Sequence, residues 1–477
     1  MLSHDWLLHR YYGYRRWMPE RLLYHADYFR VRRLLAGDAR QRGAAAAQRL
    51  RHVLGTAVAH VPFYRRSVSL SKAQLANEAP LALLECFPPL DKAQVMACQR
   101  DFLDERVDPR RLHYVTSGGS SGQGIGLWRS KRLADIEKAF FDHEWARFGF
   151  SAHRSPTLRI GADARRRAHE APTQIVGNRL MLSPYHLTAQ HRAAIVAAIA
   201  RFRPRYVHAY PSSAAALAEL IAPDRLRLRL DVRAVLLASE PATKQQLAAI
   251  AGLFGCPVSI NYGLTERTGL AFATHWRGVT GPYRFEPLYA VHENLAATCA
   301  NDGYAANARD EIVGTSLWND LMPLIRYRSG DCGALDADGV CPAIDGRAQQ
   351  FLLARDGNRI PGLSIVIDEA TWDFVRLYQV RQSIPGAITL CVVARTGRLS
   401  AAQKQRVLEA QLRRWGGWFD IAVEEVDDIP LAANSKRQLV VTDTVIHAVS
   451  HSVSHSVSDI ASKNVSGGVT DRVRDGS

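Results

Sequence analysis

The sequence predicts an α/β protein with a large N-terminal α/β domain, whose sheets are flanked by helices, and a small C-terminal α+β domain. Three observations support this prediction. Strand-like and helical segments alternate between about residues 110 and 340, which favours a sheet with helices on its faces. Two strand-like runs flank a helical segment after residue 347. The length of 477 residues exceeds that of most single domains, so at least two domains are expected.

The N-terminal segment, residues 1–45, is predicted to be helical. Residues 1–35 interleave aromatic and basic side chains. They fit either a helical layer packed on the main domain, which is favoured, or a helix on an anionic membrane surface, which would give weak peripheral association. Residues 43–60 carry apolar side chains at helical spacing and end before Pro62, as a helix does.

The large domain is expected to span residues 46–348. Its clearest strands are predicted at residues 206–210, 232–238 and 258–261, with helices at 212–221 and 243–254 between them. Alternation of this kind is typical of a sheet whose strands are joined by helices packed on its faces.

The small domain is expected at residues 349–445. Its predicted elements are strands at 386–394 and 421–426 and a helix at 400–415 between them. Residues 446–477 repeat His-Ser-Val-Ser and contain few large apolar side chains. We expect this tail to be disordered, because it cannot bury enough surface to fold.

Composition and charge exclude some classes of protein. The chain has 61 Lys and Arg against 46 Asp and Glu, a net charge of +15, which suits nucleic acid, an anionic membrane, or substrates such as ATP and coenzyme A. The basic residues are spread along the whole chain, which argues against nucleic-acid binding. No stretch resembles a signal peptide or a membrane span. Seven cysteines without a CxxC pair predict reduced thiols and a cytoplasmic protein.

The first chemical motif is YVTSGGSSGQGIG at residues 114–126. Glycines allow a backbone to approach a polyphosphate, while N–H and hydroxyl groups point towards its oxygens. The spacing matches neither a Walker loop nor the GxGxxG dinucleotide motif. A flexible Gly/Ser linker would look similar, so this motif alone leaves both interpretations open.

Two further motifs carry carboxylates. In NYGLTERTG, residues 261–269, Thr265 can bond a phosphate oxygen and Glu266 can bind Mg²⁺; alternatively, Glu266 pairs with Arg267 or another surface base. In RYRSGDCG, residues 326–333, the carboxylate of Asp331 in a Gly-Asp turn matches a ribose diol. Aspartates in glycine turns also occur for purely local reasons.

The last motifs are DGR, residues 345–347, and IPLAANSKR, residues 429–437. In this order, the motifs resemble those of the adenylate-forming superfamily of acyl-CoA synthetases, peptide-synthetase adenylation domains and luciferases. Segments outside the nucleotide site resemble the phenylacetate–CoA ligase branch, including its capsular-polysaccharide-associated homologues. These segments are AHVPFYR (59–65), FPPLD (87–91), LSPY (182–185), AYPSS (209–213), SEP (239–241) and YQVRQ (378–382). The resemblance covers about residues 45–445.

The resemblance implies ATP- and Mg²⁺-dependent activation of a small carboxylic acid as an acyl-adenylate, with release of pyrophosphate. Acyl transfer would follow as a mobile small domain rotates, with coenzyme A as the favoured acceptor. One alternative is acyl or AMP transfer to an amine or hydroxyl, for example on an amino sugar in polysaccharide biosynthesis. Another is a catalytically degenerate nucleotide-binding protein. The expected cofactors are therefore ATP, Mg²⁺ and coenzyme A, and no oligomeric state is predicted.

The resemblance also implies roles for individual residues. The phosphate grip would comprise Thr116, Ser117, Gly118, Gly119, Ser120, Ser121 and Gly122. The adenine pocket would be lined by Ser239, Glu240, Pro241, Asn261, Tyr262 and Gly263. Thr265 and Glu266 would hold the α-phosphate and Mg²⁺, Asp331 and Arg347 would hold the ribose, and Lys436 would bridge the α-phosphate and the acyl carboxylate. The acid would bind near His208, Tyr210 and Pro211, where Trp145 and Phe148 either stack on an aryl acid or belong to the core.

This chain departs from the family pattern at several positions. The family loop often ends in Pro-Lys, whereas Gln123 and Gly124 stand here, so a cation facing the phosphates is missing. Gln349 replaces the usual hinge carboxylate, and Ser435 replaces the glycine before the catalytic lysine.

Overall fold

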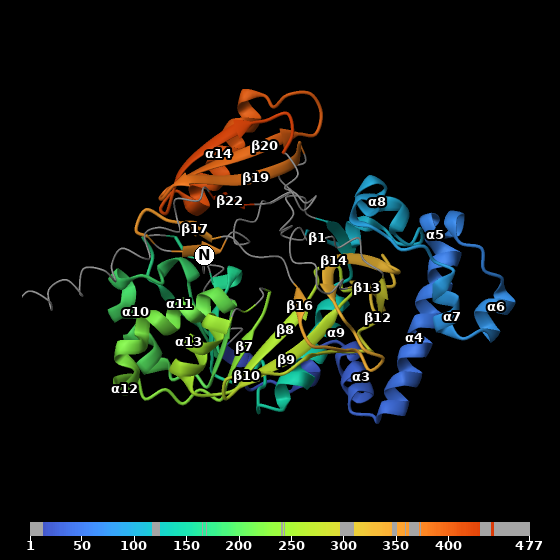
Figure 1. Ribbon diagram of the computed structural model, residues 1–477, viewed down its shortest axis with the longest axis horizontal. Helices are drawn as coiled ribbons and strands as arrows, with labels where there is room; N and C mark the ends of the chain where they lie inside the picture. Colours follow the sequence, from blue (N-terminus) through green and yellow to red (C-terminus); the bar gives the residue numbers. More distant parts are fainter. Residues whose placement is uncertain are drawn as a thin grey trace, which may run out of the picture.

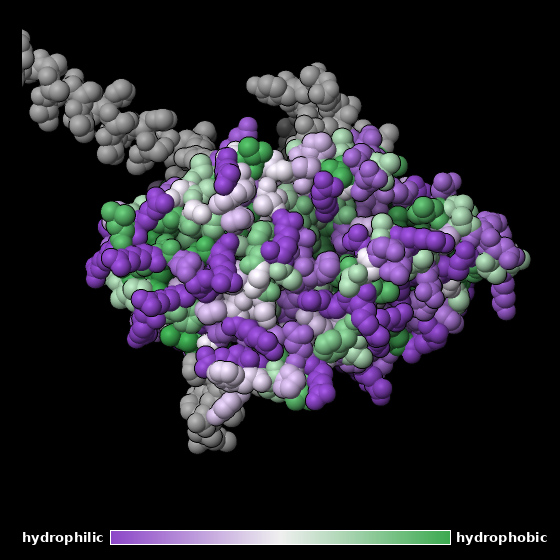
Figure 2. All heavy atoms as spheres, turned by 90° about the horizontal axis from the view of Figure 1, so that it is seen from below, coloured by the Kyte–Doolittle hydropathy of each residue, from purple (hydrophilic) through white to green (hydrophobic). Residues whose placement is uncertain are grey.

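The computed structural model describes residues 13–116, 125–164, 166–167, 169–239, 242, 244–295, 310–345, 351–357, 359–361, 372, 374–429 and 440–442. Within them the chain forms a mixed α/β fold, in which a large sheet has helices on both faces and a small α+β unit follows (Figure 1). The predicted fold class is confirmed. On the face drawn in Figure 2, hydrophilic residues are spread widely, with smaller hydrophobic patches between them.

The chain begins with a layer of helices. They are α2 (Glu20–Leu23), α3 (Ala26–Leu35), α4 (Ala39–His60), α5 (Pro62–Ser67), α6 (Lys72–Asn77), α7 (Pro80–Glu85) and α8 (Lys92–Ala97). Helix α3 packs against α9 (Arg132–Ala146), where the Tyr28 hydroxyl donates to Asp142 Oδ2 at 2.8 Å. The interpretation as a packed layer therefore holds for α3, although Tyr14 and Trp17 are 60% and 75% exposed.

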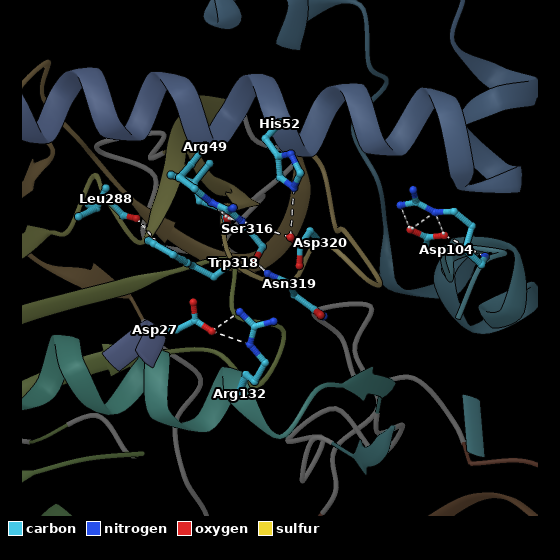
Figure 3. A network of polar contacts seen from close by, with 12 residues as sticks. Asp27, Arg49, His52, Asp104, Arg132, Leu288, Ser316, Trp318, Asn319 and Asp320 are labelled. Carbon is cyan, nitrogen blue, oxygen red and sulfur yellow. Dashed lines mark hydrogen bonds and ion pairs between the residues drawn. The ribbon is translucent and has the colours of Figure 1, made fainter. Parts of the chain in front are cut away.

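Helix α4 starts four residues before the predicted range, because Asp38 and Gln41 form a capping box at its N-terminus. Polar contacts then fix this helix to the segment after β13 (Glu311–Ser316) (Figure 3). The Arg49 guanidinium donates to the Leu317 carbonyl at 2.7 Å, and His52 Nε2 lies 3.2 Å from Asp320 Oδ2. The N-terminal helices are thus bonded to the body of the large domain.

The main sheet has ten strands. Its order is β15 (Val340–Cys341), β11 (Tyr283–Phe285), β9 (Leu270–Trp276), β8 (Val258–Gly263), β7 (Ala234–Leu237), β6 (Tyr206–Ala209), β3 (Thr157–Ile160), β5 (Arg179–Leu182) and β4 (Thr173–Val176), with β10 (Val279–Thr280) beside β9. The strands from β8 to β5 are parallel. The three strands predicted in this region are confirmed, with ends that differ from the predicted ones by at most two residues.

Helices cover both faces of this sheet. Helices α10 (Arg192–Phe202), α11 (Pro211–Ile221) and α13 (Lys244–Phe254) share an apolar core with one face, and α9 packs on the other. Short helices complete the connections: α12 (Arg225–Leu228), η1 (Gln99–Phe102), η2 (Pro109–Arg111), η3 (Ala162–Ala164), η4 (Pro184–His186), η5 (Ala189–His191) and η6 (Ala222–Asp224). The predicted helices at 212–221 and 243–254 correspond to α11 and α13.

A second, antiparallel sheet follows the order β12 (Ala290–Leu295), β13, β14 (Tyr327–Gly333) and β16 (Ile344–Asp345). A separate hairpin consists of β1 (His113–Thr116) and β2 (Gly126–Arg129). The hairpin flanks the glycine- and serine-rich segment, of which residues 117–124 lie outside the described part of the chain.

The C-terminal unit has a sheet in the order β21 (Asp420–Glu425), β20 (Ala387–Ala394), β19 (Val375–Ile384) and β22 (Val440–Thr442), with α14 (Ala401–Trp415) packed against it. A hairpin of β17 (Phe351–Leu353) and β18 (Arg359–Pro361) shares its core. Figure 1 draws this unit at the top, in orange and red. The predicted helix and both predicted strands are confirmed, whereas β19 and β22 were not predicted.

Aromatic rings join the C-terminal unit to the large domain. Tyr185 in η4 packs edge-on against Trp415, with ring centroids 4.8 Å apart, and His186 packs against Trp418 at 5.1 Å. The predicted motif LSPY therefore lies at the contact between the two parts.

The cysteines correct one prediction. Cys86, Cys98, Cys256, Cys341 and Cys391 are free thiols, but Cys332 is disulfide-bonded. The expectation of seven reduced thiols is therefore wrong at Cys332, because spacing along the sequence does not reveal which cysteines the fold brings together. Among the described residues, no helix is both long and apolar enough to cross a bilayer.

Candidate functional site

The ends of three parallel strands define the candidate site. In the register of β6, β7 and β8, Ala209 lies beside Leu237 and Leu237 beside Ile260. The segments that follow these strands therefore emerge at the same edge of the sheet. Open α/β sheets bind ligands at the carboxyl ends of their strands. The predicted residues at 208–211, 239 and 261–266 all lie at this edge.

The segment at the end of β8 provides a buried amide and a partly buried phenol. Asn261 is 9% exposed, and its Oδ1 has no hydrogen-bond partner within the described chain. The hydroxyl of the neighbouring Tyr262 donates to Asp331 Oδ2 at 2.9 Å. Burial, followed by the charge of Asp331, raises the pKa of Tyr262 well above its ordinary value, so the phenol stays protonated and remains a donor. Gly263 is exposed at the strand end.

Glu266 is a buried carboxylate. It is 8% exposed, and its Oε1 accepts a hydrogen bond of 3.1 Å from the Tyr327 hydroxyl. Arg267 instead forms an ion pair with Glu137 of α9. The alternative of a surface pair between Glu266 and Arg267 is therefore wrong, because the backbone of this segment directs the two side chains to different partners.

Asp331 lies in a strand and not in the predicted turn. It belongs to β14, where the register against β13 shifts between Glu311 and Val313. At this bulge Gly330 has a φ of 74°, and its N–H donates to Glu311 Oε1 at 2.9 Å. A bulge re-aims one side chain without ending the strand. The glycine is needed here for its left-handed backbone and not to close a turn.

The β1–β2 hairpin contacts the same region. Thr116 pairs with Gly126 at the end of the hairpin where the glycine- and serine-rich segment begins. From β2, the Arg129 guanidinium donates to the carbonyl oxygen of Thr265. Three motifs from distant parts of the sequence are thus joined around Thr265, Glu266 and Asp331.

The predicted acid-binding residues lie at the end of β6. His208 packs edge-on against Trp145 of α9, with ring centroids 5.1 Å apart. Burial, and then the charges of Arg159, Arg179 and Lys138, lower the pKa of His208 well below its ordinary value, so the imidazole is neutral near pH 7. Tyr210 is the N-cap residue of α11, and the buried Pro211 is its first residue.

The two proposed aromatic contacts differ. Trp145 is only 5% exposed and belongs to the core, although its indole N–H has no hydrogen-bond partner among the described residues. Phe148 is half-buried, and its carbonyl accepts from the Tyr206 hydroxyl at 2.9 Å. Trp145 is therefore the ring that lies beside the predicted acid-binding residues.

Several predicted site residues fall outside the described part of the chain. They are Ser117, Gly118, Gly119, Ser120, Ser121, Gly122, Glu240, Pro241, Arg347 and Lys436. The same holds for Gln349 and for the tail from residue 446. Ser239 is described: it is exposed after β7 and has a φ of 73°.

Sequence reasoning missed residues that link the motifs. Tyr327 lies within the RYRSGDCG motif, but only the fold brings its hydroxyl to Glu266. Arg129 was also missed. The available signal was its place in the strand that follows the glycine- and serine-rich segment, where a cation can return towards bound phosphates.

The carboxylate of Glu266 fits the expected magnesium ion. Mg²⁺ is usually held by one or two carboxylates together with substrate phosphates and water. In the described residues no group of three or more His, Cys, Asp or Glu side chains could hold a metal alone. A single buried carboxylate beside the expected phosphate site would meet this requirement without further protein ligands.

Comparisons with known proteins complete the description. No protein-family model matches the sequence, and neither does any curated protein. Among solved structures, the chain is similar to 2-hydroxyisobutyryl-CoA ligase in complex with R3-HIB-AMP, at a TM-score of 0.47 and 15% identity over 90% of this chain and 94% of that chain. It is also similar to the amide bond synthetase McbA from Marinactinospora thermotolerans (TM-score 0.36, 19% identity, 69% of this chain and 68% of that chain). A third is the anthranilate CoA ligase AuaEII in complex with anthranoyl-AMP (0.33, 13%, 77% and 75%). With TM-scores below 0.5, these similarities carry no argument about function.

Proposed function

We propose that the protein is an adenylate-forming ligase. It uses ATP to activate a carboxylic acid as an acyl-adenylate, releases pyrophosphate, and then transfers the acyl group to an acceptor, for which coenzyme A is our first candidate. The proposal rests on residues of this chain and on the order of its motifs.

One observation supports this proposal most. Residues 261–269 and 326–333 contact each other through two tyrosine–carboxylate hydrogen bonds, Tyr262 to Asp331 and Tyr327 to Glu266. Arg129, in the hairpin that flanks the glycine- and serine-rich segment, donates a hydrogen bond to the carbonyl oxygen of Thr265. Three motifs that are weak individually therefore meet at one sheet edge, as a shared nucleotide site requires.

In this proposal each part of the site meets one part of ATP. Asp331 accepts the ribose hydroxyls, since two carboxylate oxygens match a vicinal diol. Asn261 Oδ1, which has no hydrogen-bond partner within the described residues, accepts a hydrogen bond from the exocyclic amine of adenine. Thr265 donates to the α-phosphate, and Glu266 is the side chain that would hold Mg²⁺. When bound, that ion supplies positive charge that offsets the charge developing on pyrophosphate.

The acid is proposed to lie between β6 and α9, beside His208 and Trp145. A neutral imidazole and an unpaired indole N–H are hydrogen-bonding groups without charge. They suit a polar group on the acid, while the ring of Trp145 suits an apolar or aryl portion.

Lys436 is proposed to join the site from the small domain. Adenylation brings a carboxylate against the α-phosphate, and a cation between these two anions offsets their repulsion as charge moves to pyrophosphate. For this, the small domain has to rotate over the large one, and the same rotation would then admit the second acceptor.

The decisive experiment is ATP–pyrophosphate exchange with a panel of carboxylic acids. We expect acid-dependent exchange with the wild-type protein, and a loss of about 100-fold or more in Lys436→Ala, the size found when one group that stabilises a transition state is removed. ATP binding should be retained. Lys404→Ala is the matched control, since Lys404 lies in the same domain but pairs with Glu425.

Retained exchange in Lys436→Ala would contradict the role of that lysine. Absence of exchange with every acid, combined with ATP binding, would instead indicate a catalytically degenerate nucleotide-binding protein. Product masses after addition of coenzyme A or of amines then identify the acceptor.

A further inference from the structure

The glycine- and serine-rich segment carries no positive side chain that could neutralise a triphosphate. Residues 117–124 read SGGSSGQG and contain neither Lys nor Arg. Backbone N–H groups and hydroxyls can bond phosphate oxygens, but they do not neutralise a triphosphate. Polyphosphate sites in proteins usually combine such donors with Lys, Arg or a metal ion. A cation from another part of the chain is therefore expected.

Arg129 is the first candidate. Its side chain reaches from β2 to the carbonyl of Thr265, and its Nε is buried without a hydrogen-bond partner in the described chain. Burial, and then the neighbouring charge of Arg267, lower the pKa of Arg129 to about 10. The guanidinium thus remains charged at neutral pH, close to a second guanidinium and with a donor unused.

Arg267 is the second cation. Its side chain is 13% exposed, and its backbone has a φ of 64°. Its Nε is also buried and has no hydrogen-bond partner among the described residues. Non-glycine residues rarely adopt this conformation, and it is found where the surrounding structure holds it in place. Glu137 offsets the charge of Arg267, and the Tyr289 hydroxyl donates to the same carboxylate at 3.4 Å.

The two partly buried guanidiniums repel each other electrostatically, and each has an Nε without a hydrogen-bond partner in the described part of the chain. Such an arrangement is unfavourable unless an anion completes it. The pair lies next to Thr265 and Glu266, where the proposed function requires phosphate to bind. Glu266 also interacts electrostatically with Arg129, so the groups belong to one site.

We propose that Arg129 and Arg267 form a polyphosphate-binding pair that takes the β- and γ-phosphates of ATP and holds the pyrophosphate product. This inference rests on the proposed function for the identity of the ligand. The pair supplies from β2 and from the segment after β8 the positive charge that residues 117–124 do not contain.

Isothermal titration of the full-length protein with ATP, AMP and inorganic tripolyphosphate tests the pair without turnover. Arg129→Gln and Arg267→Gln should each weaken ATP and tripolyphosphate about 10- to 100-fold, the contribution of a hydrogen bond between charged groups. AMP affinity should stay within about twofold, as for substitutions that touch no part of its site. Arg205→Gln, in an exposed pair with Asp231, is the matched control.

Glu137→Gln tests the pair through an expected gain in tripolyphosphate affinity, whereas the arginine variants are expected to lose affinity. It removes the carboxylate that offsets Arg267 and should tighten tripolyphosphate about two- to fivefold. This variant decides the question even if Arg129→Gln does not fold, because unchanged or weaker binding in Glu137→Gln contradicts the pair. An equal loss of ATP and AMP affinity in Arg129→Gln also overturns it.

The two proposals fail in different ways. If the wild-type protein binds ATP and tripolyphosphate and neither arginine matters, only the inference about the pair is wrong. If it binds tripolyphosphate through these arginines but does not bind ATP, the pair stands as a polyphosphate site and the proposed function is wrong.

Discussion

The two faces of the main sheet are built from alternate residues of the same strands, yet they differ in chemistry. The face towards α10, α11 and α13 consists of hydrocarbon side chains, including Leu158, Ile160, Val207, Ala209, Val235 and Leu237. The face towards α9 carries Arg159 beside His208 and Leu236 beside Ser259, and Asn261 lies two residues further along β8. Period-two alternation along the strands separates the two sets.

The difference separates a face of hydrocarbon side chains from a face that also buries polar groups. On the α9 side, Ser259 Oγ, Asn261 Oδ1 and the indole N–H of Trp145 are buried without a hydrogen-bond partner in the described residues. Each buried polar group without a partner costs about 1–3 kcal/mol. A ligand that forms hydrogen bonds with these groups would recover this free energy. The hydrocarbon side chains of the apolar face cannot form such bonds.

The largest effect is expected on the apolar face. Leu237 is 1% exposed in β7, and Leu237→Ala should lower the free energy of unfolding by about 2–5 kcal/mol, because it leaves a cavity under α11 and α13. Denaturant unfolding measures this loss, and ATP affinity should not change. Leu226→Ala, at a side chain that is 90% exposed, is the control. A loss below 1 kcal/mol, or weakened ATP binding, would contradict the division between the faces.

The α/β class and several of its strands and helices could be predicted from sequence, and some of the omissions have physical causes. Apolar runs such as residues 206–210 predict buried strands correctly. Strand β19 was missed because it contains Gln379 and Gln382, which are 3% and 1% exposed. The Gln382 amide is tolerated there since it bonds the backbone of Leu353 at 2.6 Å and 2.8 Å. A buried amide with partners in another segment looks, in the sequence, like a surface residue.

The same limit applies to the site. Glu266 could be singled out because it follows a strand-like run and a threonine, and Asp331 because its carboxylate follows a glycine. Their partners could not be predicted, since Tyr327 lies 61 residues from Glu266 and Tyr262 lies 69 residues from Asp331. Contacts over such distances depend on the pairing of whole strands and not on local spacing.

Protonation of His208, on the face towards α9, should make the free energy of unfolding depend on pH. The pKa of His208 lies below its ordinary value of 6.5 in the folded protein. Below about pH 6.5 the unfolded chain therefore binds the proton first, and stability falls as the pH decreases, by up to about 1.4 kcal/mol per pH unit. In His208→Gln this part of the slope should disappear between pH 7.5 and 5.5. An unchanged slope in denaturant unfolding would contradict a neutral, buried imidazole.

The smallest change in stability is expected when a single hydroxyl is removed from the α9 face, and adding one to the apolar face provides the comparison. Ser259 is fully buried, and its Oγ has no hydrogen-bond partner among the residues that the structure describes. Ser259→Ala should therefore leave stability unchanged or raise it by up to about 1 kcal/mol. Ala273 lies beside Ile260 on the apolar face, and Ala273→Ser should cost about 1–3 kcal/mol by adding a hydroxyl without a partner. If Ser259→Ala destabilises the fold as much as Ala273→Ser, then Ser259 has a structural partner and is not kept for a ligand. If Ser259→Ala spares stability but weakens binding of the activated acid, the polar face is retained for recognition at a cost to the fold.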